Sequence, residues 1–330
     1  MRRQQRRWTI PFMVLTLALT AQIALLGAGL SQAYAAQKLK IVTTTGMIGD
    51  AVRQVGGDRV NVTALMGPGI DPHAYRQTRS DIARLLRADL VLWHGLYLEA
   101  QMEEFFHNLA KKKNVIAIAE TLPERFLVSH DTYKKRYDPH VWMNPELWSK
   151  VVTATKEVLI KHDPEGRVTY EANAEKHLAD IAKLTAYSKK VISTVPKEQR
   201  VLVTAHDAFN YFGRAYGFEV LGIQGISTES EAGLRRVEDL VSKLVQRKIS
   251  AVFIETSVAD RNIKALIEGA AARDHKVMIG GELYSDAMGK QGTYEGTYIG
   301  MIDHNITTIT RALGGQAPER GMSNRLHAGS

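Results

Sequence analysis

Residues 67–81 read GPGIDPHAYRQTRSD and hold one histidine, His73, in a turn rich in glycine and proline. The preceding stretch, VNVTALM at 60–66, is typical of a β-strand, and a helical pattern follows the turn. Pro72 fixes its own backbone dihedral angle, and Asp71 is expected to brace the turn through bonds from its side chain to the backbone. The sequence therefore places an imidazole on a stiff turn at the end of a strand.

The same succession of strand and helix continues along the whole chain. Four strands are predicted in the first half and four in the second, at 39–45, 60–66, 89–93, 114–120, 200–205, 218–225, 251–257 and 276–283. Helical patterns separate most of them. Because strands that alternate with helices form parallel sheets, we predict an α/β fold with two lobes, each a mainly parallel sheet flanked by helices.

One predicted helix between the two sets of strands is unusually long. No glycine or proline interrupts residues 168–195, and apolar residues recur there at helical spacing. A helix of roughly 25 residues is about 38 Å long. It is either a rigid connector or an ordinary long surface helix. As a connector, it would join an N-terminal lobe at 36–167 to a C-terminal lobe at 196–315, and we expect the aperiodic tail at 316–330 to be disordered.

Residues 1–35 have the parts of a secretory signal peptide. Four arginines precede an apolar run that starts at about residue 10, and the small residues Ala33 and Ala35 mark a cleavage site. An uncleaved membrane anchor is the alternative, since the apolar run is long. The chain has no cysteine, so we expect a soluble periplasmic protein that is not a lipoprotein and has no thiolate metal ligands.

The composition is that of a globular protein, with 45% hydrophobic and 24% charged residues. The formal net charge is +8, and four of the positive charges are the arginines of the predicted signal peptide. The remaining basic residues are spread along the sequence, which does not indicate a nucleic-acid partner.

Side chains that can bind a metal ion follow several predicted strands, where the ligands of α/β sheets gather. They are His73, His140, His206 and Asp286, separated by 67, 66 and 80 residues. The DPH motif of His73 returns at 138–140, where Asp138 is expected to brace a second turn. For each histidine alone, a capping or surface role is the ordinary alternative, and His94 is the next candidate ligand.

Three imidazoles and one carboxylate shared between two lobes would bind a divalent transition ion. Four protein ligands leave no obvious position for water, so the set suits capture and release better than catalysis. Glu255, at the end of another predicted strand, is a candidate to orient a ligand or to neutralise the site. Trp142 is expected to pack beside the site.

Five motifs occur in a fixed order along the chain: GIDPHAYRQTRSD, DPHVWMNP, VTAHDAFNYFGRAYGFEVLGIQGISTESEA, VFIETS and GGELYSDAMG. Through them, residues 39–313 resemble the TroA-like metal-binding proteins of ABC transporters, the group that binds manganese and zinc. The resemblance implies two lobes joined by one rigid helix, and delivery of the ion to an inner-membrane permease and its ATPase. It assigns the metal ligands to His73, His140, His206 and Asp286.

The resemblance leaves manganese and zinc both open as the transported ion. Some members carry a glutamate at the third ligand position and favour manganese or iron, whereas this chain has His206, as in the type that binds zinc or manganese. Dedicated zinc members often have a long loop rich in histidine and acidic residues, but the stretch at 124–140 is short and holds one extra histidine, His130. We therefore expect one Mn²⁺ or Zn²⁺ ion, with manganese accommodated if Asp286 binds through both oxygens.

An exported metal-dependent hydrolase is the main alternative to a solute-binding protein. It would use the same ligands with a water in place of one, and Glu255 as the base. No HExxH or similar motif occurs in the sequence to support it. A surface adhesin with a structural metal is a third option, which the missing anchor cysteine weakens. The favoured interpretation is a protein that is not an enzyme and forms no stable oligomer.

Overall fold

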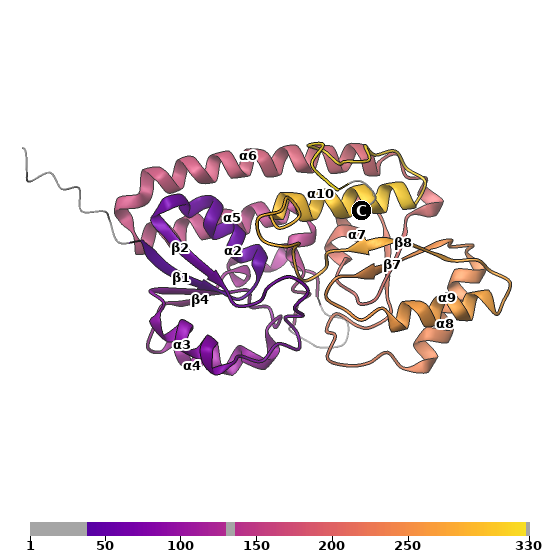
Figure 1. Ribbon diagram of the computed structural model, residues 1–330, viewed down its shortest axis with the longest axis horizontal. Coiled ribbons are helices and arrows are strands. Elements are labelled where there is room, and N and C mark those ends of the chain that lie inside the picture. The colour runs from indigo at the N-terminus through magenta and orange to yellow at the C-terminus, as the bar shows by residue number, and fades with distance from the viewer. Residues whose placement is uncertain (1–37, 130–135, 328–330) are drawn as a thin grey trace, which may run out of the picture. The chain divides into compact units, whose positions relative to one another are not determined.

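The computed structural model describes residues 38–129 and 136–327. The predicted signal peptide lies outside these residues, and so does His130. Within the described ranges, no helix is both long enough and apolar enough to cross a bilayer. Figure 1 shows strands and helices alternating along the chain, as the sequence predicts.

The first four strands form one parallel sheet in the order β2-β1-β3-β4. The strands are β1 (Leu39–Thr43), β2 (Val60–Ala64), β3 (Leu90–Trp93) and β4 (Val115–Ala117), and the helices among them are α2 (Gly46–Gly56), α3 (Arg79–Arg87) and α4 (Glu103–Ala110). Thr45 caps the start of α2 and Gly57 ends it with a positive φ of 53°, which glycine adopts without strain. Short turns therefore return the chain to the sheet after each helix.

Alternation along the strands supplies two separate cores, one on each face of this sheet. Ile41 and Leu92 belong to the cluster that contains α2, whereas Val42 and Trp93 belong to the cluster that contains α3 and α4. Successive side chains of a strand point to opposite faces. Figure 1 accordingly shows α2 and a later helix, α5 (Pro145–His162), on one side of the sheet, with α3 and α4 on the other. A sheet buried on both faces explains the continuous apolar run at β3.

The second half of the chain also consists of parallel strands flanked by helices. Its elements are β5 (Val201–Thr204), α7 (Asn210–Tyr216), β6 (Glu219–Gly222), α8 (Leu234–Gln246), β7 (Ala251–Glu255), α9 (Arg261–Ala271), β8 (Met278–Leu283) and α10 (Tyr298–Ala312). The strands pair as β5 with β6 and β7 with β8, in two separate parallel ladders, and β5 lies beside β7. The predicted α/β class is confirmed, although the second half has two short ladders in place of one sheet.

The long predicted helix is confirmed as α6 (Arg167–Ile192), which has 26 residues. It follows α5 (Pro145–His162) and packs against α2, α5 and α10, as Figure 1 shows. Its buried positions include Ala174, Ile181 and Leu184, which recur at the helical spacing that the sequence shows. The helix thus contacts elements from both halves of the chain, while the exact lobe boundaries stay a prediction.

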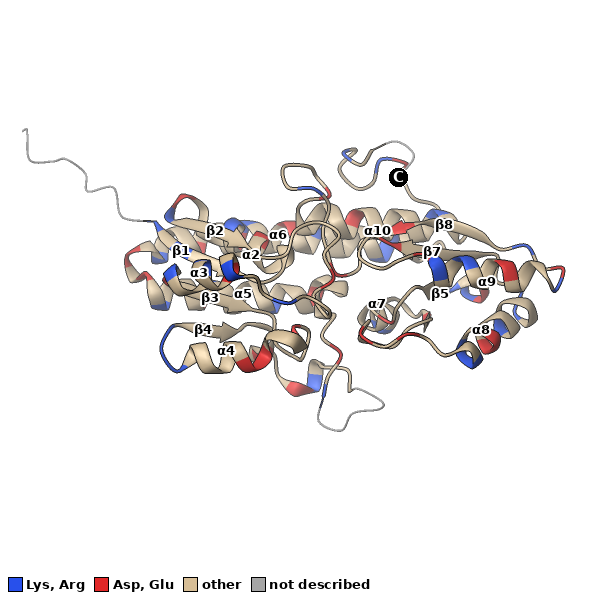
Figure 2. Cartoon of the chain, turned by 60° about the horizontal axis from the view of Figure 1, so that its bottom comes forward, with Lys and Arg blue, Asp and Glu red and all other residues tan. Residues whose placement is uncertain are grey.

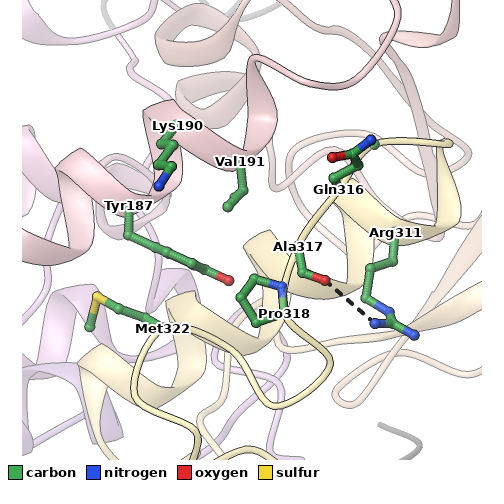
Figure 3. A pocket seen from close by; sticks show the side chains of 9 residues that line it. Tyr187, Lys190, Val191, Arg311, Gln316, Ala317, Pro318 and Met322 are labelled. Carbon is green, nitrogen blue, oxygen red and sulfur yellow. Dashed lines mark hydrogen bonds between the residues drawn. The ribbon is translucent and has the colours of Figure 1, made fainter.

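The C-terminal segment differs from the expectation of disorder over residues 316–327. The backbone N–H of Gln316 donates to Thr194 at 2.7 Å, and the N–H of Met322 donates to the buried carboxylate of Asp303 at 2.9 Å. Arg311 donates to the carbonyl of Ala317, at the edge of an open groove of about 650 Å³ between α6 and this segment (Figure 3). Backbone anchoring of this kind has no periodic signature in a sequence. Residues 328–330 lie outside the described part.

Basic and acidic residues are mixed along the exposed helices, as Figure 2 shows. In α8, for example, Arg235 and Arg236 are followed by Glu238 and Asp239. The net positive charge of the chain is therefore not gathered along these helices, which is consistent with the spread that the sequence shows.

Candidate metal centre

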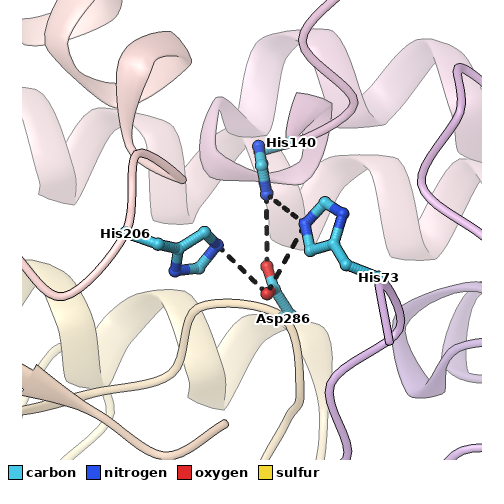
Figure 4. A group of neighbouring side chains, drawn as sticks. All are labelled: His73, His140, His206 and Asp286. Atoms are coloured by element: carbon cyan, nitrogen blue, oxygen red, sulfur yellow. Dashed lines mark hydrogen bonds and ion pairs between the residues drawn. The ribbon is translucent and has the colours of Figure 1, made fainter. Parts of the chain in front are cut away.

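Four side chains from distant parts of the chain converge on one point. They are His73 in the turn after β2, His140 just before α5, His206 after β5 and Asp286 after β8. One ligand atom from each lies within 4.8 Å of the others, and Figure 4 shows the three imidazoles surrounding the carboxylate. Each of these residues is at most 2% exposed. The structure therefore brings together all four side chains that the sequence singled out.

The three imidazoles present the same nitrogen, Nε2, to the centre of the cluster. His73 Nε2 lies 3.3 Å from His140 Nε2 and 3.9 Å from an oxygen of Asp286. The Nε2 atoms of His140 and His206 lie 3.4 and 3.1 Å from the two oxygens of Asp286. A small shift of these atoms is enough to place all of them around one ion, because metal–nitrogen bonds are about 2.0–2.1 Å long.

Several of these atoms have no hydrogen-bond partner. Both oxygens of Asp286 and the Nε2 of His206 are buried and make no hydrogen bond of acceptable geometry within the described residues. The 3.1 Å approach between these two side chains is therefore an ionic contact. Buried polar groups without a partner are costly. Three imidazole nitrogens and a carboxylate are a donor set for a divalent transition ion, so the residues present can hold one metal ion.

Two carboxylates fix the orientation of two of the imidazoles. Asp138 accepts from the backbone N–H of His140 at 2.9 Å and from its ring Nδ1 at 2.7 Å, through one oxygen. Glu255 accepts from the backbone N–H of His206 at 2.9 Å and from its ring Nδ1 at 2.5 Å, through its two oxygens. A proton held on Nδ1 leaves the lone pair of Nε2 free for a metal ion. The suggested orienting position of Glu255 thus agrees with its contacts.

Asp71 binds the backbone of His73 and not its ring. One of its oxygens accepts from the backbone N–H of His73 at 2.8 Å, as a brace of the turn should. The other oxygen accepts from the hydroxyl of Thr228 at 2.5 Å, and it does not contact the imidazole ring. Asp71 therefore does not orient the ring of His73 in the way that Asp138 and Glu255 orient the rings of His140 and His206.

The carboxylates also decide which imidazoles carry a proton. Burial opposes the charge on His140, but Asp138 and Asp286 outweigh it and raise the pKa of His140 to about 9. Burial likewise opposes the charge on His206, and Asp286 and Glu255 raise its pKa well above the ordinary value. Burial lowers the pKa of His73 to about 3. At neutral pH the metal-free centre therefore holds protons on two imidazoles, which an ion must displace.

His94, the next candidate from the sequence, is not part of the cluster. Its ring Nε2 lies 2.7 Å from the carbonyl of Pro139, and its backbone N–H donates to the buried Glu99. The ring meets the indole of Trp142 edge-on at 5.0 Å. His94 therefore stabilises the turn that carries His140 through its contact with Pro139.

The turn of His140 makes further contacts, of which the packing of Trp142 beside the site was expected from the sequence and the hydrogen bonds were not. Trp142 donates from its indole N–H to the carbonyl of Ser285 at 2.8 Å, and its ring lies 5.2 Å from His140. Asn210 donates to the second oxygen of Asp138 at 3.1 Å, and Tyr211 donates to the Asp138 carbonyl at 2.8 Å. Both of these residues begin α7, which follows His206 directly. The turn of His140 is thereby tied to the segments that carry His206 and Asp286.

Comparison with known proteins agrees with this donor set. The family described as "Zinc-uptake complex component A periplasmic" (ZnuA) matches residues 41–312. The manganese-binding lipoprotein MntA of Bacillus subtilis is 46% identical over 297 residues, which cover 89% of this chain and 97% of MntA. The zinc-binding protein TroA of Treponema pallidum is 46% identical over 285 residues, which cover 86% of this chain and 92% of TroA.

A solved structure agrees with the fold. The periplasmic zinc-binding protein TroA of Treponema pallidum superposes with a TM-score of 0.82 and 47% sequence identity, and the match covers 84% of this chain and 99% of that chain. The alternation of helices with parallel strands and the long helix are thus typical of a known architecture.

One expectation from the sequence is wrong. The chain was expected not to be a lipoprotein, but MntA of Bacillus subtilis and PsaA of Streptococcus anginosus, which is 30% identical over 307 residues, are both named lipoproteins. The expectation rested only on the absence of cysteine. That absence bears on one chemistry of attachment and does not decide whether a protein is held at a membrane. A location outside the cytoplasm remains consistent with these relatives.

Proposed function

The chain belongs to the ZnuA family, the metal-binding, solute-binding proteins of ABC transporters, and from this premise we propose that it carries one Mn²⁺ or Zn²⁺ ion on four side chains. These are His73, His140, His206 and Asp286. The ion is the cargo of the protein. The protein is not an enzyme, and the comparisons give the alternative of a metal-dependent hydrolase no support.

One observation carries this proposal. The Nε2 atoms of three histidines and the carboxylate of Asp286 converge within 4.8 Å in a buried cluster, and both carboxylate oxygens lack a hydrogen-bond partner in the described residues. A catalytic metal site keeps a position open for water or substrate, whereas a site closed by four protein donors holds its ion. The arrangement therefore suits capture and delivery.

The donor set accommodates either of the two ions. Imidazole suits zinc, and the order of intrinsic affinities also places zinc above manganese. Manganese prefers oxygen donors, and the two unpartnered oxygens of Asp286 can both turn toward an ion. The relatives are named for manganese, for zinc and, in the case of YfeA of Yersinia pestis, for iron. We propose that the supply of metal in the compartment decides which ion is loaded.

Solute-binding proteins of ABC transporters work with a membrane permease and its ATPase, which are the partners of this protein. We propose that it acts as a monomer, because one chain supplies all four donors and the site needs no second copy. We also propose that the ion is held between an N-terminal and a C-terminal lobe. Because α6 packs against helices of both halves, release would follow from a small tilt that withdraws one or two donors.

Metal analysis of the purified protein tests the proposal. After removal of bound metal with a chelator and reloading, we expect one divalent ion for each chain. Each of the four single alanine variants should hold far less, while His107→Ala, at an exposed histidine of α4, should load fully. Loading of less than a few tenths of an ion by the unaltered protein would count against the proposal.

A further inference from the structure

Two separate cavities reach the metal centre, and each touches a different donor. A cavity of about 330 Å³ is lined by Asp286 together with Thr63 and Met66, and is called the Asp286 cavity here. A second cavity of about 220 Å³ is lined by His73 together with Tyr97 and Ser230, and is called the His73 cavity. The two share no lining residue, and neither His140 nor His206 lines either of them. The cluster is therefore bordered by one cavity at Asp286 and by another at His73.

Beside the His73 cavity, a hydrogen bond joins the two halves of the chain. The lining of this cavity includes residues from the segment 226–230, which comes from the second half of the chain. Thr228 in this segment donates to Asp71 at 2.5 Å, and the side-chain amide of Gln224 donates to the carbonyls of Thr228 and Ser230 at 3.3 and 3.2 Å. A separation of the two halves on this side would break the bond from Thr228 to Asp71.

In the described part of the chain, no hydrogen bond joins the first-half lining of the Asp286 cavity to its second-half lining, although bonds such as that from the Gly289 N–H to the Glu295 carbonyl hold the 286–296 loop together. The lining of this cavity consists mainly of main chain, small residues and the buried thioether side chains of Met66 and Met288. Asp286 lines this cavity, and its two oxygens face the Nε2 atoms of His140 and His206 at 3.4 and 3.1 Å. It is the anionic member of the four donors, so it attracts a cation more strongly than the imidazoles do. This donor is therefore suited to be the first that an arriving ion meets.

Apart from Asp286, one charged side chain lines this cavity, that of Arg53 in α2. The guanidinium makes no hydrogen bond or ion pair that the described residues record, and it lies alongside Gly49, where an added Cβ would be 3.3 Å from both terminal nitrogens. Arg53 belongs to the last turn of α2, and its side chain reaches back toward Gly49, one helical turn earlier. Arg53 thus places an uncompensated positive charge on the path to Asp286.

We propose that the transported ion reaches and leaves the centre through the Asp286 cavity, and that the charge of Arg53 slows its passage. This proposal rests on the proposed function. A positive side chain on the path repels a divalent ion in both directions, because the same barrier is crossed on binding and on release. Arg53 then lengthens the time for which the protein keeps its cargo.

Single substitutions that narrow one cavity at a time test the route. Thr63→Trp fills the mouth of the Asp286 cavity from the exposed face of the edge strand β2, and Asn61→Trp adds the same bulk two residues earlier, outside the cavity. Ser230→Trp narrows the His73 cavity in the same way. Association and dissociation of Zn²⁺ and Mn²⁺ are followed by stopped-flow competition with a coloured chelator.

We expect Thr63→Trp to slow association and dissociation by the same factor, roughly tenfold, and to leave the dissociation constant unchanged. Asn61→Trp and Ser230→Trp should keep the rates of the unaltered protein. Slowing by Ser230→Trp alone, equal slowing by both cavity variants, or unchanged rates in Thr63→Trp would each overturn the proposed route. If the unaltered protein failed to bind either ion, the proposed function itself would be refuted.

Variants of Arg53 test its part in the barrier. Arg53→Gln should raise the association rate by roughly threefold to tenfold at low salt, and the gain should shrink as ionic strength rises. Arg53→Lys keeps the charge and should keep the rate of the unaltered protein. An association rate in Arg53→Gln that equals that of Arg53→Lys at every salt concentration would remove Arg53 from the proposal.

Discussion

Replacement of Glu255 by glutamine tests how the imidazole of His206 is prepared for a metal ion. Glu255 is 4% exposed, and it accepts one hydrogen bond from the backbone and one from the ring of His206. A glutamine offers one acceptor and one donor group in place of two acceptors. If its carbonyl faces the ring, the backbone N–H of His206 loses its partner. If its NH₂ faces the ring, the proton moves to Nε2, which then cannot bind metal.

The size of the effect follows from these two outcomes. A buried donor left without an acceptor costs about 1–3 kcal/mol. Loss of a carboxylate that orients a metal-bound histidine typically weakens metal binding by about 10- to 100-fold, or about 1.4–2.7 kcal/mol. Because Glu255 contacts both the backbone and the ring of His206, we expect Glu255→Gln to lie near the upper end of this range.

Competition titration against a coloured chelator measures this change for Zn²⁺ and Mn²⁺. Glu282→Gln, at an exposed glutamate of β8, is the matched control and should bind metal as the unaltered protein does. Circular dichroism of the metal-free variant reports whether the fold is kept. A folded Glu255→Gln protein whose affinity is within twofold of the control would show that His206 does not need this carboxylate.

Three other changes have defined outcomes. Asp286→Ala removes the anionic donor of the cluster, which lies on a loop. We expect the affinity for metal to fall more than about 100-fold, with an unchanged circular dichroism spectrum. Loss of helical signal would show that the residue is structural. The raised pKa values of His140 and His206 stabilise the metal-free fold fully below about pH 6.5, and this contribution should be lost as the pH rises through about 9. Metal affinity should rise over the same range. Calorimetry that shows a constant free energy of unfolding from pH 6 to pH 10 would contradict this sign. Arg59→Ala breaks the half-buried ion pair with Asp163, whose atoms are 2.7 Å apart. It should lower the free energy of unfolding by about 2 kcal/mol without changing the metal affinity in the titration. An unchanged free energy of unfolding in urea would contradict this prediction.

Most of the fold was accessible from the sequence because the strands are buried and the helices are amphipathic. The apolar run of β3 and the uninterrupted pattern of α6 each allow one interpretation of element type. The periodicity of a sequence does not reveal which strands pair or which distant residues bind each other. The separate ladders of β5 with β6 and of β7 with β8, and the anchoring of the C-terminal segment by Asp303, depend on contacts between distant residues.

The donors of the candidate site were accessible for a different reason. His73, His206 and Asp286 follow predicted strands, and the repeated DPH motif points to His140 as well. The supporting residues were harder to find. Asp138 was expected to brace a turn, and its bond to the ring of His140 was missed, although the motif places it two residues away. Asn210 gives no signal in the sequence, because its role exists only through the contact with Asp138.

The central claim is that one chain closes four donors around a single ion. Anomalous diffraction from crystals of the metal-loaded protein, recorded on either side of the zinc and manganese absorption edges, locates that ion directly. We expect one strong peak about 2.0–2.2 Å from the Nε2 atoms of His73, His140 and His206 and from the carboxylate of Asp286. A peak elsewhere in the molecule, or an ion at the cluster that leaves two of these four side chains unbound, would contradict the account.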